Sequence, residues 1–128
     1  MAISNTWKLR AGCADMVLND MRSGAKLSGG MIVKISGLQW IPTDTAAGEA
    51  AGCVLGVVGD YYNSGDLVNI ERNGRFTVWA DSEVQAGKPI MATAGGKVAI
   101  SDGGAKTIGF AVEKIESGLA GAAEICIV

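Results

Sequence analysis

Short hydrophobic runs separated by glycine-rich turns follow one another from residue 26 to the C-terminus. Such runs, bounded by Gly, Pro, Asn or Asp, are typical of β-strands, and no sustained helical spacing of apolar residues occurs after residue 26. The runs are 31–36, 38–41, 53–58, 66–72, 75–80, 89–93, 97–100, 107–112 and 122–128. The pattern predicts an all-β domain of about nine short strands, a small β-barrel or β-sandwich of β-tulip or jelly-roll-like form.

Two turn motifs predict hairpins within this domain. Asn73-Gly74 separates 67–72 from 75–80, and both residues tolerate the positive φ of a type I′ turn. The segment 94–96 contains two glycines and predicts a second hairpin, between 89–93 and 97–100.

Alternation along 75–80 assigns its side chains to two faces. Phe76, Val78 and Ala80 share one face, and Thr77 and Trp79 share the other. Trp79 is therefore a candidate for a contact on the outer face, or alternatively a cover for the edge of the sandwich.

Residues 1–25 differ from the rest of the chain. Hydrophobic side chains alternate there with polar and charged ones, and Gly12 and Gly24 bracket a segment too short for a well-capped helix. We predict an extended N-terminal arm over 1–25 and a β-barrel or sandwich domain over 26–128. The alternative is an ordinary first strand packed on the core.

An internal repeat is visible at a spacing of 53 residues. It aligns 55–58 with 108–111 and Ser64-Gly65 with Ser117-Gly118. Two similar hairpins predict a pseudo-symmetric barrel, with chance similarity in a glycine-rich chain as the alternative.

Composition narrows the classes of function. The length of 128 residues predicts one domain with a single core. The net charge of −2 provides no field that would attract nucleic acid, and a chain without histidine has no Ser-His-Asp or Cys-His catalytic system. Cys13, Cys53 and Cys126 form no CxxC pair and are expected to be reduced. Neither a signal peptide nor a stretch of the roughly 20 apolar residues that span a membrane is visible.

Three possible chemical sites were weighed. The segment 103–107 lacks the glycines of a phosphate loop, and Asp60 and Asp66 flank one loop without further ligands at calcium-binding spacing. Lys114 loosely resembles the modified lysine of lipoyl or biotinyl carrier domains but lacks their flanking residues. We therefore predict no enzyme activity and no catalytic, cofactor-binding or metal-binding residues.

Residues 26–128 resemble the bacteriophage capsid decoration (cement) proteins. The resembling stretches are Ser28-Gly29-Gly30-Met31-Ile32-Val33-Lys34-Ile35, Ala46-Ala47-Gly48, Val54-Leu55-Gly56-Val57-Val58, Ser64-Gly65-Asp66-Leu67-Val68-Asn69-Ile70, Val84-Gln85-Ala86-Gly87-Lys88-Pro89-Ile90, Gly95-Gly96-Lys97-Val98 and Ile108-Gly109-Phe110-Ala111-Val112. The resemblance implies a protein of the virion surface, made in the host cytoplasm, that binds the expanded icosahedral capsid and bridges neighbouring subunits of the major capsid protein. It also implies a homo-oligomer, with a trimer favoured and a dimer as the alternative, and without nucleic-acid or membrane partners.

Seven residues are candidates for the capsid or oligomer interface. The arm residues are expected on the capsid side, and the two later tryptophans are interface candidates with the core as their alternative. The set is Trp7, Leu9, Val17, Leu18, Met21, Trp40 and Trp79. Two other functions stay open: a small tail or fibre adaptor, and a carrier domain modified at Lys114.

Overall fold

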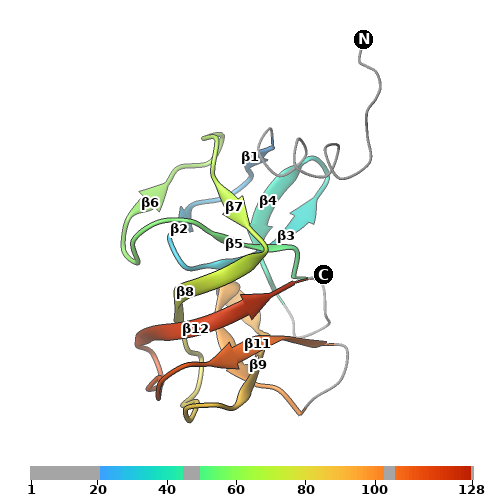
Figure 1. The fold of residues 1–128 in the computed structure, drawn as a ribbon. Helices are drawn as coiled ribbons and strands as arrows, with labels where there is room; N and C mark the ends of the chain where they lie inside the picture. The colour runs from blue at the N-terminus through green and yellow to red at the C-terminus, as the bar shows by residue number, and fades with distance from the viewer. Residues whose placement is uncertain (1–20, 45–49, 103–105, 128) are drawn as a thin grey trace.

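The structure, a computed structural model, describes residues 21–44, 50–102 and 106–127. Apart from short 3₁₀ turns, every regular element in these residues is a β-strand, which confirms the all-β prediction (Figure 1). The elements are β1 (Arg22–Ser23), β2 (Leu27–Ser28), β3 (Ile32–Ser36), β4 (Gln39–Pro42), β5 (Gly52–Val54), β6 (Tyr61–Tyr62), β7 (Ile70–Glu71), β8 (Asn73–Trp79), β9 (Pro89–Ala92), η1 (Ala94–Gly96), β10 (Val98–Ile100), β11 (Thr107–Ala111) and β12 (Ala120–Cys126).

The strands form two larger sheets and one small one. One sheet has the order β1-β4-β3-β5-β7, another has the order β10-β9-β11-β12-β8, and β2 pairs with β6. Within these sheets, the pair β1–β4 is parallel and the other neighbours are antiparallel. Figure 1 shows β1–β7 in its upper half and β8–β12 in its lower half; we call these the first half and the second half.

The buried hydrophobic residues form two clusters, so the prediction of a single core is wrong. The reason lies in β3 and β5, whose alternate side chains point to opposite faces. Val33 and Val54 point into the cluster of the first half, whereas Ile32 and Cys53 point into that of the second half. The strands β3 and β5 therefore lie between the two clusters and contribute side chains to both.

The two halves repeat one architecture. A parallel pair in the first half has a parallel counterpart in the second, and an antiparallel pair and a backbone hydrogen bond also recur. The matching contacts are Ser23–Trp40 with Ala80–Val98, Leu27–Tyr62 with Val84–Ile115, and Gly30–Val54 with Gly87–Ala111. The repeat is therefore a property of the fold and not of glycine content alone.

The register of this repeat differs in part from the predicted one. Ser64-Gly65 does match Ser117-Gly118, because the amides of Gly65 and Gly118 donate to Ser23 and Ala80 at 2.8 and 2.9 Å. The segment 55–58 does not match β11, because Val54 is the counterpart of Ala111. The first half thus has four more residues than the second in the connection that follows this strand, and this insertion displaced the sequence alignment.

Asn73-Gly74 does not form the predicted hairpin turn. Both residues begin β8 and pair with Cys126 and Ile125 of β12, whereas β7 belongs to the other sheet. The chain passes from one sheet to the other here, and Gly74 (φ 138°) provides the backbone freedom for that passage. The second predicted hairpin is confirmed by the antiparallel pair β9–β10.

The end of the predicted arm lies in the folded domain. Met21 is buried in the first cluster, and β1 extends the sheet beside β4. Ser23 is also buried, and its hydroxyl lies 2.8 Å from the carbonyl oxygen of Asn63. The boundary predicted at residue 25 is therefore too late for residues 21–25, while residues 1–20 lie outside the described ranges.

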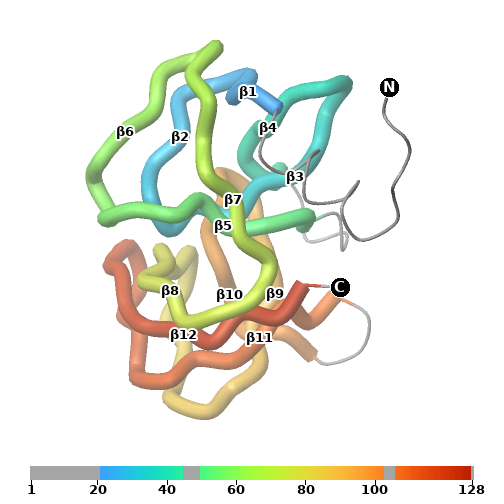
Figure 2. The backbone as a smooth tube through the Cα atoms, turned by 45° about the horizontal axis from the view of Figure 1, so that its top comes forward, coloured from blue at the N-terminus to red at the C-terminus, as the bar shows by residue number. Residues whose placement is uncertain are grey.

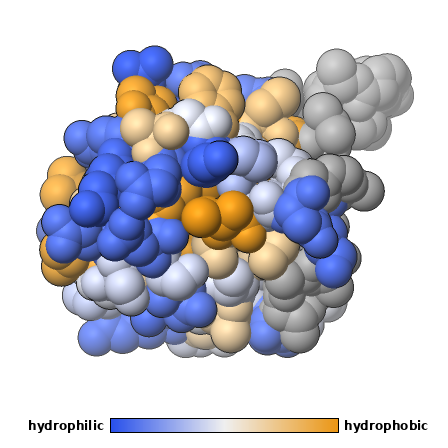
Figure 3. Space-filling model, turned by 90° about the horizontal axis from the view of Figure 1, so that it is seen from below, coloured by the Kyte–Doolittle hydropathy of each residue, from blue (hydrophilic) through white to orange (hydrophobic). Residues whose placement is uncertain are grey.

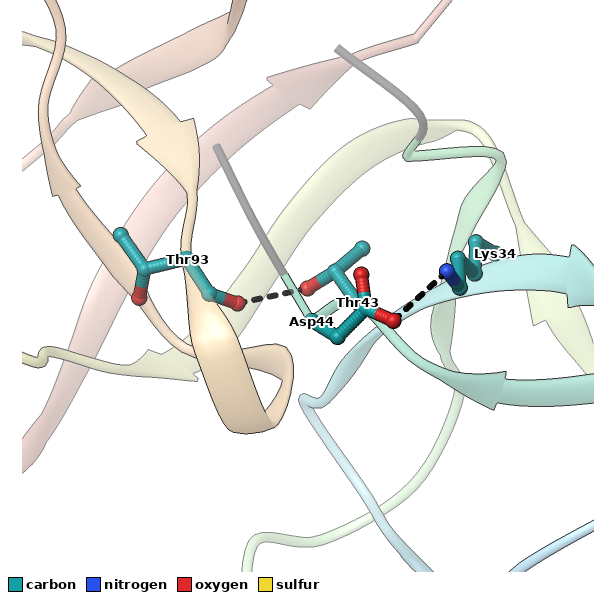
Figure 4. Close-up of polar contacts among 4 residues, drawn as sticks. All are labelled: Lys34, Thr43, Asp44 and Thr93. Carbon is teal, nitrogen blue, oxygen red and sulfur yellow. Dashed lines mark hydrogen bonds and ion pairs between the residues drawn. The ribbon is translucent and has the colours of Figure 1, made fainter. Parts of the chain in front are cut away.

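Thr43 joins the two halves (Figure 4). Its buried hydroxyl donates to the carbonyl oxygen of Thr93 at 2.8 Å, and its own carbonyl accepts from the amides of Gly95 and Gly96 at 2.8 and 3.2 Å. Beside it, Asp44 forms an ion pair with Lys34 at 2.9 Å. The turn of the β9–β10 hairpin is thus docked on the end of β4.

Candidate interaction surface

The structure places the seven predicted interface residues very differently. Trp40 is completely buried and Met21 is 7% exposed, and both pack in the first cluster. Because neither offers appreciable surface to a partner, they are core residues and their assignment to the interface is corrected. Trp79 is only partly buried. The remaining four, Trp7, Leu9, Val17 and Leu18, lie outside the described residues.

The candidate metal-binding and nucleophilic side chains lie in surroundings that serve the fold. Asp66 accepts a hydrogen bond from the amide of Asn63 at 2.8 Å, which caps a turn. Within the described ranges, no group of three His, Cys, Asp or Glu residues is placed to hold a metal ion. Burial raises the pKa of the Cys53 thiol from 9.0 to about 12, which keeps it protonated. These groups therefore give no support to a reactive centre.

Lys114 lies in the connection between β11 and β12. Its ammonium group is 3.9 Å from a carboxylate oxygen of Glu83, and both side chains are about half exposed. The next residue, Ile115, is buried and pairs with Val84. The lysine is thus placed ahead of the Ser117-Gly118 turn and not at its tip, and its modification stays a prediction.

Trp79 lines a groove of about 250 Å³ where the two halves meet. β8 points Val78 into the second cluster and Trp79 to the opposite face, as the alternation along this segment predicts. The lining comes from both halves: Ser28, Met31 and Tyr61 from the first, and Trp79, Gly95, Lys97 and Gly118 from the second. Aromatic and methionine side chains beside few polar groups are typical of a surface that binds protein.

Glycines bring the walls of this groove together. Gly30 has φ +81°, and a Cβ atom built on it would lie 2.0 Å from the carbonyl oxygen of Thr77 in β8. Gly96 has φ +73°, and a Cβ atom there would lie 2.2 Å from Cγ of Met31. Side chains larger than hydrogen would push the halves apart at both points. The close contact between the halves beside the groove therefore depends on Gly30 and Gly96, one residue from each Gly-Gly motif.

Exposed apolar residues surround the same region. The four-residue insertion of the first half carries Leu55 and Val57, which are 42% and 68% exposed, next to Tyr61 at 59%. The carbonyl oxygen of Val57 packs against Gly29, where an added Cβ atom would lie 2.5 Å from it. The ammonium group of Lys26 is 4.4 Å from the ring centre of Tyr61. The shorter connection of the second half instead places the charged Glu113 and Lys114 at the surface. The two connections therefore differ in surface chemistry: the one in the first half exposes hydrophobic side chains, and the one in the second half exposes charged ones.

Hydrophobic side chains are also exposed elsewhere on the second half. Figure 3 shows hydrophobic side chains gathered at the centre of the face seen from below, surrounded by hydrophilic ones. The exposed hydrophobic residues of the second half include Phe110 on β11, at 47%. Single exposed hydrophobic residues are common on protein surfaces and carry little information alone.

Sequence reasoning identified Trp79 but missed the rest of the groove. Its walls come from segments almost 70 residues apart, such as Ser28 and Lys97. The available signal was the pair of Gly-Gly motifs, which were interpreted as turns. Glycines also mark places where two backbones approach closely, and here Gly30 and Gly96 do so across the contact between the halves.

Comparison with solved structures shows which known fold the chain shares. The chain is a small, internally repeated all-β domain with two five-stranded sheets and one two-stranded sheet. No family model matches it, and no curated protein does so. Among solved structures, the head fiber gp8.5 N base of bacteriophage phi29 is similar, with a TM-score of 0.64 and 18% sequence identity. The match covers 82% of this chain and 89% of that one, so the two share a fold.

In the described residues, no helix is long and apolar enough to cross a membrane.

Proposed function

We propose that this protein is a structural component of a phage head that binds the outer surface of the capsid without chemical turnover. The observation that carries the proposal is the shared fold with a phage head fiber base, over most of both chains. The resemblance of several sequence stretches to capsid decoration proteins supports it independently of that match. The partly apolar groove at Trp79 adds a surface suited to a protein partner.

The proposed contact has two parts. One part is the Trp79 groove with Val57 and Tyr61, which are 68% and 59% exposed. The other is the arm, for which the sequence predicts apolar residues on the capsid side. Interfaces of standard size bury roughly 800 Å² on each partner. An oligomer that contacts several capsid subunits at once gains strength from linked contacts, and so bridges neighbouring major capsid proteins.

Binding to expanded, undecorated phage heads tests the proposal. We expect the full chain to co-sediment with heads at a fixed ratio, and the variant Trp79→Ala to bind at least tenfold more weakly. Phe110→Ala is the matched control, because it removes an exposed aromatic side chain of β11 that does not line the groove and should leave binding unchanged. If Trp79→Ala binds heads as tightly as the full chain does, the groove takes no part in the contact with the capsid.

A fibre base is the second candidate, and the name of the phi29 protein favours it specifically. Both candidates bind heads, but their effects on the capsid differ. A decoration protein bridges capsid subunits and raises the temperature at which emptied heads disassemble. A fibre base is an attachment point and leaves that temperature unchanged. Heating heads with and without saturating protein therefore separates the two.

The carrier hypothesis has its own test. Intact-mass measurement of protein isolated from its natural source shows whether Lys114 carries a covalent group. We expect the unmodified mass.

A further inference from the structure

Among the described residues, β7 is the last strand of its sheet, whereas its counterpart in the second half has a further strand beside it. β7 and β12 are counterparts, because each pairs with the matching strand of its half, β5 or β11. The matching pairs are Val54–Ile70 with Ala111–Ala123, and Cys53–Glu71 with Phe110–Glu124. On its other side, β12 pairs with β8 along its whole length. Figure 2 shows β8 beside β12 and β7 beside β5.

One contact of the first half marks the position that β8 holds in the second half. An isolated antiparallel bridge matches the last pair of β8 with β12, and the backbone hydrogen bond next to this pair recurs as well. The matching contacts are Arg22–Leu67 with Trp79–Ala120, and Ser23–Asp66 with Ala80–Leu119. In the second half, the strand continues from this point back to Asn73. The chain just before Arg22 is therefore the counterpart of β8.

The side chains agree with this assignment. Residues directly opposite each other in an antiparallel pair lie on one face, so the register places Met21 beside Val68, and both are buried in the first cluster. The same register places Asn19 beside Ile70 on that face. The cluster also holds a buried donor, since Trp40 is fully buried and its Nε1 has no hydrogen-bond partner in the described residues. A side-chain carbonyl from Asn19 would supply an acceptor there.

We infer that residues 18–21 extend β1 as an antiparallel strand along 68–71, in the place that β8 holds beside β12. The occupant of this sheet edge is the chain's own segment, because the chain already enters the edge at Arg22. Unpaired backbone groups at a sheet edge attract a further strand, and a segment joined to the edge is present there at high effective concentration. Leu18 then lies on the outer face beside Glu71, whether or not the protein binds a capsid.

Cross-strand disulfides test the register. Leu18 and Glu71 would form a non-hydrogen-bonded pair, whose Cα atoms lie about 4.5 Å apart, within the range that a disulfide bridges. In a background with Cys13→Ser and Cys126→Ser, Leu18→Cys/Glu71→Cys should form a disulfide within one chain under mild oxidation. Leu18→Cys/Asn69→Cys is the matched control: Asn69 is also exposed but lies two positions out of register, so this variant should stay unlinked.

Non-reducing electrophoresis and peptide mass spectrometry distinguish the outcomes. A link within one chain at the predicted pair supports the inference. A link between two chains would make a second copy the occupant of the edge and contradict it. The absence of any link, or equal linking of the two variants, would contradict it as well.

Amide hydrogen exchange tests the pairing in a chain that keeps its cysteines. We expect the amide of Ile70 to be protected, like that of its counterpart Ala123, which pairs with Phe76. Asn19→Pro removes an amide that would donate to Ile70, and proline cannot donate to a strand ladder. Exchange at Ile70 should therefore become faster by about tenfold or more, while exchange at Ala123 stays unchanged. An Ile70 amide that is unprotected in the full chain, or equally protected in Asn19→Pro, would overturn the inference.

Discussion

At the scale of single residues, the two described tryptophans separate core from surface. Trp40 is fully buried among the hydrophobic residues of the first cluster, and truncating such a side chain leaves a cavity. We expect Trp40→Ala to lower the free energy of unfolding by about 3–5 kcal/mol. Urea unfolding followed by circular dichroism measures this loss.

The comparison is Trp79→Ala, which removes a partly exposed side chain and should cost clearly less than Trp40→Ala. If the two substitutions destabilise the protein equally, Trp79 has a structural role comparable to that of Trp40. The sequence could not distinguish these residues, because each lies within a predicted strand. Only the packing of the folded halves buries one of them completely.

The Cys53 thiol should be unreactive in the folded protein. Burial raises its pKa from 9.0 to about 12, and the thiolate is the reactive form. In the Cys13→Ser, Cys126→Ser background, we expect no reaction with a thiol reagent at pH 8 until the chain is unfolded. Since the unfolded thiol ionises first, the stability that Cys53 contributes is complete below pH 9 and is lost as the pH rises toward 12. Rapid labelling of the folded variant at pH 8 would contradict this burial.

At the scale of elements, glycines control the contact between the halves. Gly30 and Gly65 both have positive φ, of 81° and 92°, but only at Gly30 would a Cβ atom meet backbone, at 2.0 Å from the oxygen of Thr77. Alanine at a left-handed position costs about 1–2 kcal/mol through its backbone alone. We expect Gly65→Ala to show that cost and Gly30→Ala to exceed it, by thermal unfolding. Equal losses would mean that β8 yields to the added methyl group at no cost.

The sequence predicts many strands but not their partners. The β9–β10 hairpin follows from local turn residues and is confirmed. The Asn73-Gly74 turn fails, although its local signal is stronger, because β8 pairs with β12 at the far end of the chain. Local turn preference cannot show that a chain changes sheets at this point. The repeat was detectable, but the four-residue insertion shifted its alignment.

At the scale of the whole molecule, two halves with separate clusters share β3 and β5 as a wall. This arrangement explains how so short a chain holds two cores, and why the contact between the halves creates the Trp79 groove. The candidate surface was predictable only at Trp79. The other walls depend on close backbone contacts between distant segments, which composition and alternation do not encode.

The N-terminal segment is predicted to contact the capsid, and its role can be separated from that of the folded domain. Because Met21 and Ser23 are buried in the domain, deletion of residues 1–20 removes the predicted capsid-side residues other than Met21 without removing the first strand. We expect the truncated chain to give the circular dichroism spectrum of a folded β-domain but to lose binding to heads. Normal binding by the folded, truncated chain would show that the arm has no part in the contact.

The most direct test of the central claim is electron microscopy of expanded, undecorated heads mixed with the purified full chain. The account predicts added density on the outer surface of the capsid, at repeated positions that contact more than one major capsid subunit. Heads that stay bare at saturating concentrations of folded protein would contradict it.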